Sequence, residues 1–241
     1  MKATNDKELK DSYDEWYETW ELEPSGPSKN FHKFILGKLE AKDGGKLLDV
    51  ACGKGYLLRK AREMGFETHG LDLSDKALEK AKEIAPEATL VQGSAEALPF
   101  KDNEFDYVTC IGSVEHFLNP GKGVAEMARV AKPGGRVLIY VPNEYWVWFV
   151  LRAWLKGKKP TQHQDNTIFM AYEGWKELLE SSGLEIERTL PHHFPFDSNL
   201  GRQWKISPWS FMFNIATAFS FLFPLNACYH FIFLCKKRGS Q

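Results

Sequence analysis

Apolar segments with the length of strands alternate with segments of helical periodicity between residues 46 and 142. Strands are expected at 46–51, 67–72, 88–92, 105–111 and 136–142. Helices are expected at 56–64, 75–85 and 123–132, the second with Ser74 as its N-cap. Strands that alternate with helices of about ten residues pair in parallel through right-handed crossovers. The pattern therefore predicts an α/β doubly wound fold with helices on both faces of the sheet.

The length and the charge balance fit one globular domain that does not coat nucleic acid. The 241 residues include 31 Lys+Arg and 32 Asp+Glu, which gives a formal net charge of −1 and no basic footprint. The four cysteines, Cys52, Cys110, Cys228 and Cys235, contain no CxxC pair, and no secretory leader is recognisable. We therefore expect a reduced, cytoplasmic protein without a metal site.

Two flanks surround this alternating core. Residues 1–45 are polar and aromatic and predict a helical cap, with one helix near 31–39. Residues 143–171 form an aromatic insertion, and residues 172–241 add a helix and strands that complete the sheet. Gly183 is expected to end the helix that begins at residue 172. The whole chain, 1–241, is thus predicted to be a single domain.

One long uncharged run complicates this interpretation. Lys205 and Lys236 flank thirty residues without Asp, Glu, Lys or Arg, which is long enough for a membrane span. Pro208 and Pro224 divide the run, and residues 229–235 have the pattern of a buried strand. A packed helix followed by a strand is the favoured interpretation, and a membrane span is the alternative.

The segment LLDVACGKG, residues 47–55, is a hydrophobic strand that leads into a glycine turn. Gly53 and Gly55 lack a Cβ, so the backbone can turn sharply and a ligand can lie against it. A dinucleotide fingerprint would place a third glycine at position 58, where this chain has Leu58. The segment predicts a ligand-binding turn, with an ordinary tight turn as the alternative.

Asp72 ends the second predicted strand, about twenty residues after the glycine turn. An acidic side chain at this place can accept hydrogen bonds from both hydroxyl groups of a ribose. The alternative is a capping or solvated aspartate beside Ser74. The spacing favours a nucleoside ligand.

Five motifs in order resemble the class I S-adenosylmethionine-dependent methyltransferases. They are LLDVACGKG, GLDLS, VQGSAEALPFKDNEFDYV, IGSVEHFLNP and RVAKPGGRVLIYVPN. Within that class the chain is similar to the small-molecule enzymes of ubiquinone and menaquinone biosynthesis. The resemblance implies a Rossmann-like, mostly parallel sheet of seven strands with the last strand antiparallel. It also implies S-adenosylmethionine as cofactor and S-adenosylhomocysteine as product.

The resemblance assigns cofactor contacts residue by residue. The methionine part would lie against Asp49, Ala51, Gly53 and Gly55, and above Cys110 and Ile111. The ribose would bind Asp72, and the adenine would lie beside Leu73, Ser94, Ala95 and Glu96. Ala51 replaces the first glycine of the family, and Ser94 stands where the family commonly has aspartate. Tyr13 and Tyr17 either close over the cofactor or pack as ordinary helix residues.

The acceptor side is expected in the loops that follow the later strands, because ligands of open parallel sheets bind there. His116 is the first candidate for a general base, and a histidine bonded to local backbone is its alternative. His193 is the second catalytic candidate, and His192 is expected to contact the acceptor. A metal cluster of these two with His163 is disfavoured because no carboxylate spacing supports it.

The segment EYWVWFVLRAWL, residues 144–155, carries Trp146 and Trp148 next to the expected acceptor site. Such a helix is a lid over an apolar substrate, a membrane-surface patch or a core packing element. The first interpretation assigns both tryptophans to substrate binding. The second implies peripheral contact of a cytoplasmic protein with a membrane.

The sequence thus predicts a methyltransferase that acts on a small, apolar or aromatic acceptor by in-line displacement. An NAD-dependent oxidoreductase is disfavoured by Leu58 and by the absence of a Tyr-xxx-Lys pair. A non-catalytic S-adenosylmethionine-binding protein stays open, because this class has no universal catalytic residue. A nucleic-acid methyltransferase is disfavoured by the neutral charge, and a protein substrate stays open.

Overall fold

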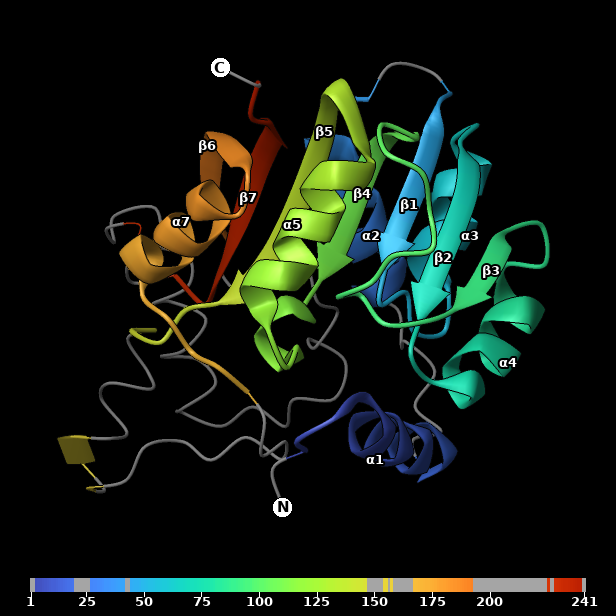
Figure 1. The fold of residues 1–241 in the computed structure, drawn as a ribbon, viewed down its shortest axis with the longest axis horizontal. Coiled ribbons are helices and arrows are strands. Elements are labelled where there is room, and N and C mark those ends of the chain that lie inside the picture. The colour runs from blue at the N-terminus through green and yellow to red at the C-terminus, as the bar shows by residue number, and fades with distance from the viewer. Residues whose placement is uncertain are drawn as a thin grey trace, which may run out of the picture.

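The fold is built on a seven-stranded sheet with the strand order β3-β2-β1-β4-β5-β7-β6 (Figure 1). The computed structural model describes residues 3–19, 27–41, 44–146, 154, 155, 157, 167–192, 225 and 228–239, with side chains of the second range from residue 31. The strands are β1 Lys46–Val50, β2 Glu67–Asp72, β3 Thr89–Gln92, β4 Phe105–Ile111, β5 Ala131–Pro142, β6 Leu184–His192 and β7 His230–Lys237.

Strand pairing confirms the predicted fold class. The first five strands pair in parallel, from β3 at one edge to β5. The last strand, β7, inserts between β5 and β6 and runs antiparallel to both. Residues 229–235 therefore hold a buried strand, as predicted, and it lies beside the fifth strand.

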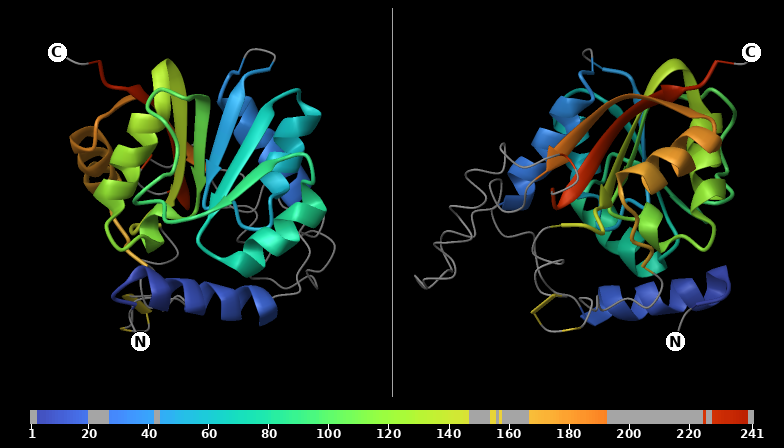
Figure 2. Two further views of the ribbon diagram at one scale, coloured as in Figure 1. Left: turned by 45° about the vertical axis from the view of Figure 1, so that its right-hand side comes forward. Right: turned by 90° about the vertical axis from the view of Figure 1, so that its left-hand side faces the viewer.

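Helices cover both faces of the sheet, and one helix crosses its end. The helical elements are α1 Asp6–Thr19, α2 Pro27–Lys38, α3 Tyr56–Glu63, α4 Asp75–Ile84, the 3-10 turn η1 Val114–His116, α5 Pro120–Val130 and α7 Tyr172–Ser181. Side chains of α2, α3 and α4 share one hydrophobic cluster, and those of α5 and α7 share the other. Helix α1 lies apart from both, across the side to which the first four strands point (Figures 1 and 2).

The boundaries of α5 and β5 correct the prediction. The helix was expected at 123–132, but it begins at Pro120 because the Asn119 side chain accepts a hydrogen bond from the Lys122 N–H at 3.1 Å. The strand was expected from residue 136, but pairing with β4 starts at Ala131 and contains a register shift. Gly135 fits this irregularity because an added Cβ would lie 3.0 Å from the Asp106 carbonyl oxygen.

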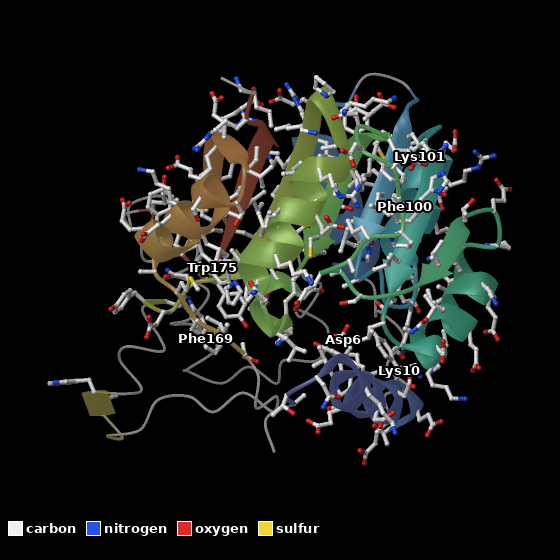
Figure 3. The ribbon with its side chains drawn as sticks, in the orientation of Figure 1. Asp6, Lys10, Phe100, Lys101, Phe169 and Trp175 are labelled. Atoms are coloured by element: carbon white, nitrogen blue, oxygen red, sulfur yellow. The ribbon has the colours of Figure 1, made fainter. Side chains whose placement is uncertain are left out.

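The buried side of α7 is fixed to the sheet by Trp175 (Figure 3). Its indole is fully buried, and Nε1 donates a 2.9 Å hydrogen bond to the Pro142 carbonyl at the end of β5. Gly183 follows α7 with φ of +92°, which agrees with its predicted role at the end of that helix.

Within the ranges that the structure describes, no helix is both long enough and apolar enough to cross a membrane. The helix predicted between Lys205 and residue 229 lies outside the described residues, apart from Leu225 and Cys228.

Phe233 provides a test of how far the sheet depends on β7. The side chain is fully buried and pairs with Ile139 of β5 and Thr189 of β6. Phe233→Ala is expected to lower the free energy of unfolding by about 3–5 kcal/mol, measured by urea denaturation. The control Lys236→Ala, on the same strand with a half-exposed side chain paired to Glu185, should lose less than about 1 kcal/mol. Equal losses in the two variants would contradict a central role for β7.

Candidate functional site

A cavity of about 490 Å³ lies at the carboxyl ends of the first strands. Its walls come from the β1–α3 turn, the end of β2, the loop after β3, the loop after β4 and helix α1. Figure 3 places α1, with Asp6 and Lys10 labelled, below these strand ends. Ligands of parallel sheets bind at this edge, so the cavity is the candidate functional site.

The glycine turn between β1 and α3 forms the floor of the cavity. Ala51, Gly53 and Gly55 have φ values of +58°, +53° and +76°. A Cβ on Gly53 would lie 2.7 Å from the hydroxyl oxygen of Tyr17, so only glycine fits between the turn and α1. A Cβ on Gly55 would instead lie 3.1 Å from the Cβ of Ala81, so this glycine permits close packing of α3 on α4.

Asp72 joins the turn to the end of β2. Its Oδ2 accepts a 2.8 Å hydrogen bond from the Gly53 N–H, and its Oδ1 accepts one of 2.9 Å from the Ser74 N–H. The side chain is only 6% exposed and lines the cavity. Burial raises the pKa of this carboxyl, while the two backbone N–H groups oppose the rise. The carboxylate is therefore oriented before any ligand arrives.

Asp49, near the end of β1, is a second buried carboxyl of the cavity wall. The Thr109 hydroxyl donates a 2.6 Å hydrogen bond to its Oδ1. Burial raises the pKa of Asp49 to about 7, and the nearby charge of Asp72 adds to the rise. A cation in the cavity would stabilise the ionised form of both groups.

The loop after β3 forms the wall opposite the glycine turn. Ser94 and Ala95 line the cavity, and the Ser94 hydroxyl accepts a 3.3 Å hydrogen bond from the Glu96 N–H. The Glu96 carboxylate accepts a 2.7 Å hydrogen bond from the Asn119 N–H, which ties this loop to the start of α5.

Helix α1 closes the cavity with Tyr13, Trp16 and Tyr17. Burial raises the pKa of both tyrosine hydroxyls, which keeps them neutral. No residue of α1 is fully buried, and polar contacts attach the helix to α4. The Asp14 carboxylate accepts a hydrogen bond from the Ser74 hydroxyl, and Lys10 pairs with both Asp14 and Asp75. The cover is thus held by ionic contacts rather than by a core.

The end of β4 contributes Ile111 to the cavity, and the segment after it contributes Gly112, His116 and Phe117. The Nδ1 atom of His116 lies 3.2 Å from the Thr167 hydroxyl, and burial lowers the pKa of its ring to about 4. His116 is therefore a neutral side chain in the cavity wall at neutral pH.

Most residues that the sequence assigned to the cofactor meet in this cavity. Those that line it are Asp49, Ala51, Gly53, Asp72, Leu73, Ser94, Ala95, Glu96 and Ile111, together with the base candidate His116. Gly55 and Cys110 lie behind the wall, Gly55 against α4 and Cys110 fully buried at the end of β4.

The predicted acceptor contacts lie elsewhere or outside the described residues. The Trp146 indole packs on Tyr229 with ring centroids 4.4 Å apart, and the buried His192 Nδ1 is 2.9 Å from the Tyr140 hydroxyl. Neither side chain is among the lining residues. His193 and Trp148 lie outside the described residues.

Some lining residues carried no clear signal in the sequence. Leu9 and Trp16 of α1, Tyr56 of α3, and Phe117 belong to this group. Trp16 stands between Tyr13 and Tyr17 at helical spacing, which could have indicated one aromatic face. Tyr56 follows Gly55 directly and is the first residue of α3.

Charge sets the chemistry that the cavity favours. Asp6, Asp49, Asp72 and Glu96 line it, whereas none of the described lining residues is Lys or Arg. Such a wall attracts a cationic ligand and disfavours a pyrophosphate group.

Comparison with known proteins agrees with the geometry. Residues 48–139 match the family model described as "Methyltransferase domain". The demethylmenaquinone methyltransferase of Renibacterium salmoninarum is 34% identical over 114 residues, which are 47% of this chain and 48% of that protein. The ubiquinone/menaquinone biosynthesis C-methyltransferase of Burkholderia mallei is 29% identical over 189 residues, covering 68% of this chain and 77% of that protein.

Among solved structures, the [4+2]-cyclase SpnF matches all of this chain and 99% of its own, with a TM-score of 0.68 and 18% identity. This likeness shows the fold alone. The alignment with the Renibacterium protein spans about half of that relative's length.

The pKa of Asp49 predicts a pH dependence of stability. The carboxyl ionises near pH 7 in the folded protein but near its ordinary value of 3.8 when unfolded. Between these values the folded state holds the extra proton, so the contribution of Asp49 to stability falls as the pH rises. In urea denaturation, the advantage of Asp49→Asn over the wild type should grow between pH 4 and pH 7 and then level off. A constant difference across this range would contradict the raised pKa.

Proposed function

We propose that the protein, whose residues 48–139 match the methyltransferase domain model, transfers a methyl group from S-adenosylmethionine to a small acceptor. The acidic wall of the cavity carries this proposal. S-adenosylmethionine carries a sulfonium and an ammonium group in its methionine part, so it would bring positive charge next to the buried Asp49. An oxidoreductase would need to place the pyrophosphate of NAD against the same wall.

The residues present fit the cofactor at each of its parts. Asp72, whose orientation is fixed by the Gly53 N–H, would accept hydrogen bonds from the ribose hydroxyls. Leu73, Ser94 and Ala95 would lie on the adenine side, and Asp49 with the glycine turn on the methionine side. When bound, S-adenosylmethionine supplies an electrophilic methyl group on a positively charged sulfur.

The protein's part in the reaction is alignment. Displacement at the methyl carbon requires the acceptor atom, the carbon and the sulfur to lie in line, which is an entropic task. Ile111, Phe117 and the aromatic face of α1 exclude water and present an apolar surface. His116 lies in the same wall and is the first candidate to take a proton from an acceptor that must lose one.

An apolar or aromatic acceptor fits this lining and the names of the relatives. The two curated relatives reported above act, by their names, in menaquinone or ubiquinone synthesis. We carry over the class, a small apolar or aromatic molecule, and not the compound.

Cofactor binding is the first test. Asp72→Ala should weaken binding of S-adenosylhomocysteine about 10- to 150-fold in titration calorimetry, because hydrogen bonds to a charged group are worth about 1.5–3 kcal/mol. The affinity of Asp72→Asn, which keeps one oxygen acceptor, should lie between those of the wild type and Asp72→Ala. Glu67→Ala, at the exposed start of the same strand, is the matched control and should bind normally. Binding of NAD, or unchanged affinity in Asp72→Ala, would contradict the assignment.

If ionic contacts hold α1 over the cavity, removing them by substitution should speed ligand release. Asp14→Ala removes contacts to Ser74 and Lys10 and should speed dissociation of S-adenosylhomocysteine about 3- to 10-fold. Asp11→Ala, at an exposed position of the same helix, is the control. Stopped-flow fluorescence can follow the exchange because Trp16 lines the cavity. Equal dissociation rates in the two variants would show that α1 does not retain the ligand.

Catalysis is tested with labelled cofactor. The protein is incubated with S-adenosylmethionine that carries a tritiated methyl group and with a reduced naphthoquinone, a simple phenol, a primary amine and a free amino acid. Transfer to the naphthoquinol or phenol, and not to the amino acid, is the expected result. Tight cofactor binding without transfer to any acceptor would instead support the non-catalytic binding protein.

A further inference from the structure

Glu115 is a buried carboxyl that the protein leaves without a full set of partners. Its side chain belongs to a residue only 4% exposed, and Oε2 has no hydrogen-bond partner among the described residues. An unpartnered buried polar atom costs about 1–3 kcal/mol. Glutamate is therefore a costly choice at this position unless the carboxyl has a use.

The carboxyl lies directly behind two residues of the cavity wall. Its Oε1 is 4.0 Å from Nε2 of His116 and 3.8 Å from where a Cβ on Gly112 would lie. Gly112 has φ of +63°, which favours glycine, and both Gly112 and His116 line the cavity. Gly112 therefore places no side chain beside Oε1.

The backbone and the ring of this segment are held in place. The Ile168 N–H donates a 2.8 Å hydrogen bond to the Glu115 carbonyl oxygen. The ring of His116 is held by a 3.2 Å contact between its Nδ1 atom and the Thr167 hydroxyl. Nε2 of His116 lies 4.0 Å from Oε1 of Glu115, which is longer than a hydrogen bond. One proton donor could reach both Nε2 and Oε1 with ordinary hydrogen-bond lengths.

The titratable groups near Glu115 on other elements are neutral, so they do not fix its protonation state. Tyr13 of α1 and Cys110 of β4 are near enough for the charge of Glu115 to raise their pKa values, and both are neutral near pH 7. Burial raises the pKa of Glu115 to about 8, and burial lowers that of His116 to about 4. Near neutral pH the Glu115 carboxyl is therefore mostly protonated and the His116 imidazole is neutral, so neither side chain carries a full charge.

We propose that Glu115 is a positioning residue that acts through His116, and that the two form one acid–base pair which takes a proton from an O–H or N–H group of the methyl acceptor. This inference rests on the proposed methyl transfer and narrows its acceptor to one that must lose a proton.

The step starts from the carboxylate form of Glu115, which the positive sulfur of the bound cofactor would favour over the protonated form. The acceptor heteroatom gives its proton to the pair and forms a bond to the methyl carbon. The carbon–sulfur bond breaks with its electrons left on sulfur. The products are the methylated acceptor, the neutral thioether and a protonated pair.

Histidine NMR tests the pair without any acceptor. The full chain is labelled at the Cε1 carbon of its 7 histidines, and His116→Gln assigns the His116 signal. In the wild type that signal should shift with an inflection near pH 8, and the inflection should vanish in Glu115→Gln. Thr167→Val, which removes the other contact of the ring, is the control that should keep it. Absence of the inflection from the wild type, or its survival in Glu115→Gln, would overturn the proposal.

Activity and stability then separate a catalytic use from simple proximity. On an acceptor found with the labelled cofactor, Glu115→Gln should lower kcat about 10²- to 10⁴-fold with KM and S-adenosylhomocysteine affinity within threefold of wild type. Its melting temperature should be unchanged or higher, and Glu115→Asp should restore part of the rate. A kcat within threefold of wild type, or a lower melting temperature that accounts for the loss, would overturn the proposal. Failure of the protein to bind S-adenosylhomocysteine would instead refute the proposed function, while the NMR result would still decide whether the pair exists.

Discussion

The hydrogen bond from the Gly53 N–H to Asp72 holds together the edge of the sheet on which the site depends. It joins the turn after β1 to the end of β2 across 19 residues of sequence, at 2.8 Å. Without this donor and that of Ser74, burial would favour the protonated form of the Asp72 carboxyl more strongly. Ser74, which donates to Asp72, is also the N-cap of α4, where its hydroxyl accepts a hydrogen bond from the Ala77 N–H. The same hydroxyl donates a hydrogen bond to the Asp14 carboxylate of α1. One small set of contacts therefore sets the turn, the next helix and the cover of the cavity.

The sheet and the cover are stabilised in different ways, and the difference suits a site that must open. The strands and α5 and α7 bury apolar side chains such as Phe233 and Trp175, whose contribution grows with the area removed from water. Helix α1 has no fully buried residue and is attached by pairs such as Lys10 with Asp75 at 2.9 Å. Exposed ion pairs contribute little each and are weakened by salt. The contacts that attach α1 are therefore separate from those that stabilise the sheet.

The sequence was enough to predict the parallel core and most of the cavity floor, because both depend on local patterns. The apolar run before Gly53 and the acidic end of β2 are readable from spacing alone. The start of α5 differs from the predicted residue 123, because Asn119 caps the helix and Pro120 is its first residue. The part played by Glu115 could not be predicted, because its burial and its 4.0 Å separation from His116 arise only when η1 packs against residues 167 and 168. The acceptor contacts predicted at Trp148 and His193 lie outside the described residues.

The buried acids of this site oppose folding and favour binding for the same reason. Asp49 and Glu115 have pKa values raised to about 7 and about 8 because burial disfavours their charged forms. A cationic ligand reverses that preference, since its charge stabilises the carboxylates that the empty protein tends to protonate. The burial of these acids lowers the stability of the empty protein, and the same charges add to the free energy of binding a cation. Binding and stability are therefore linked. Hydrophobic replacements at these positions would make a more stable fold, but they would remove the charge that distinguishes a sulfonium from a neutral ligand.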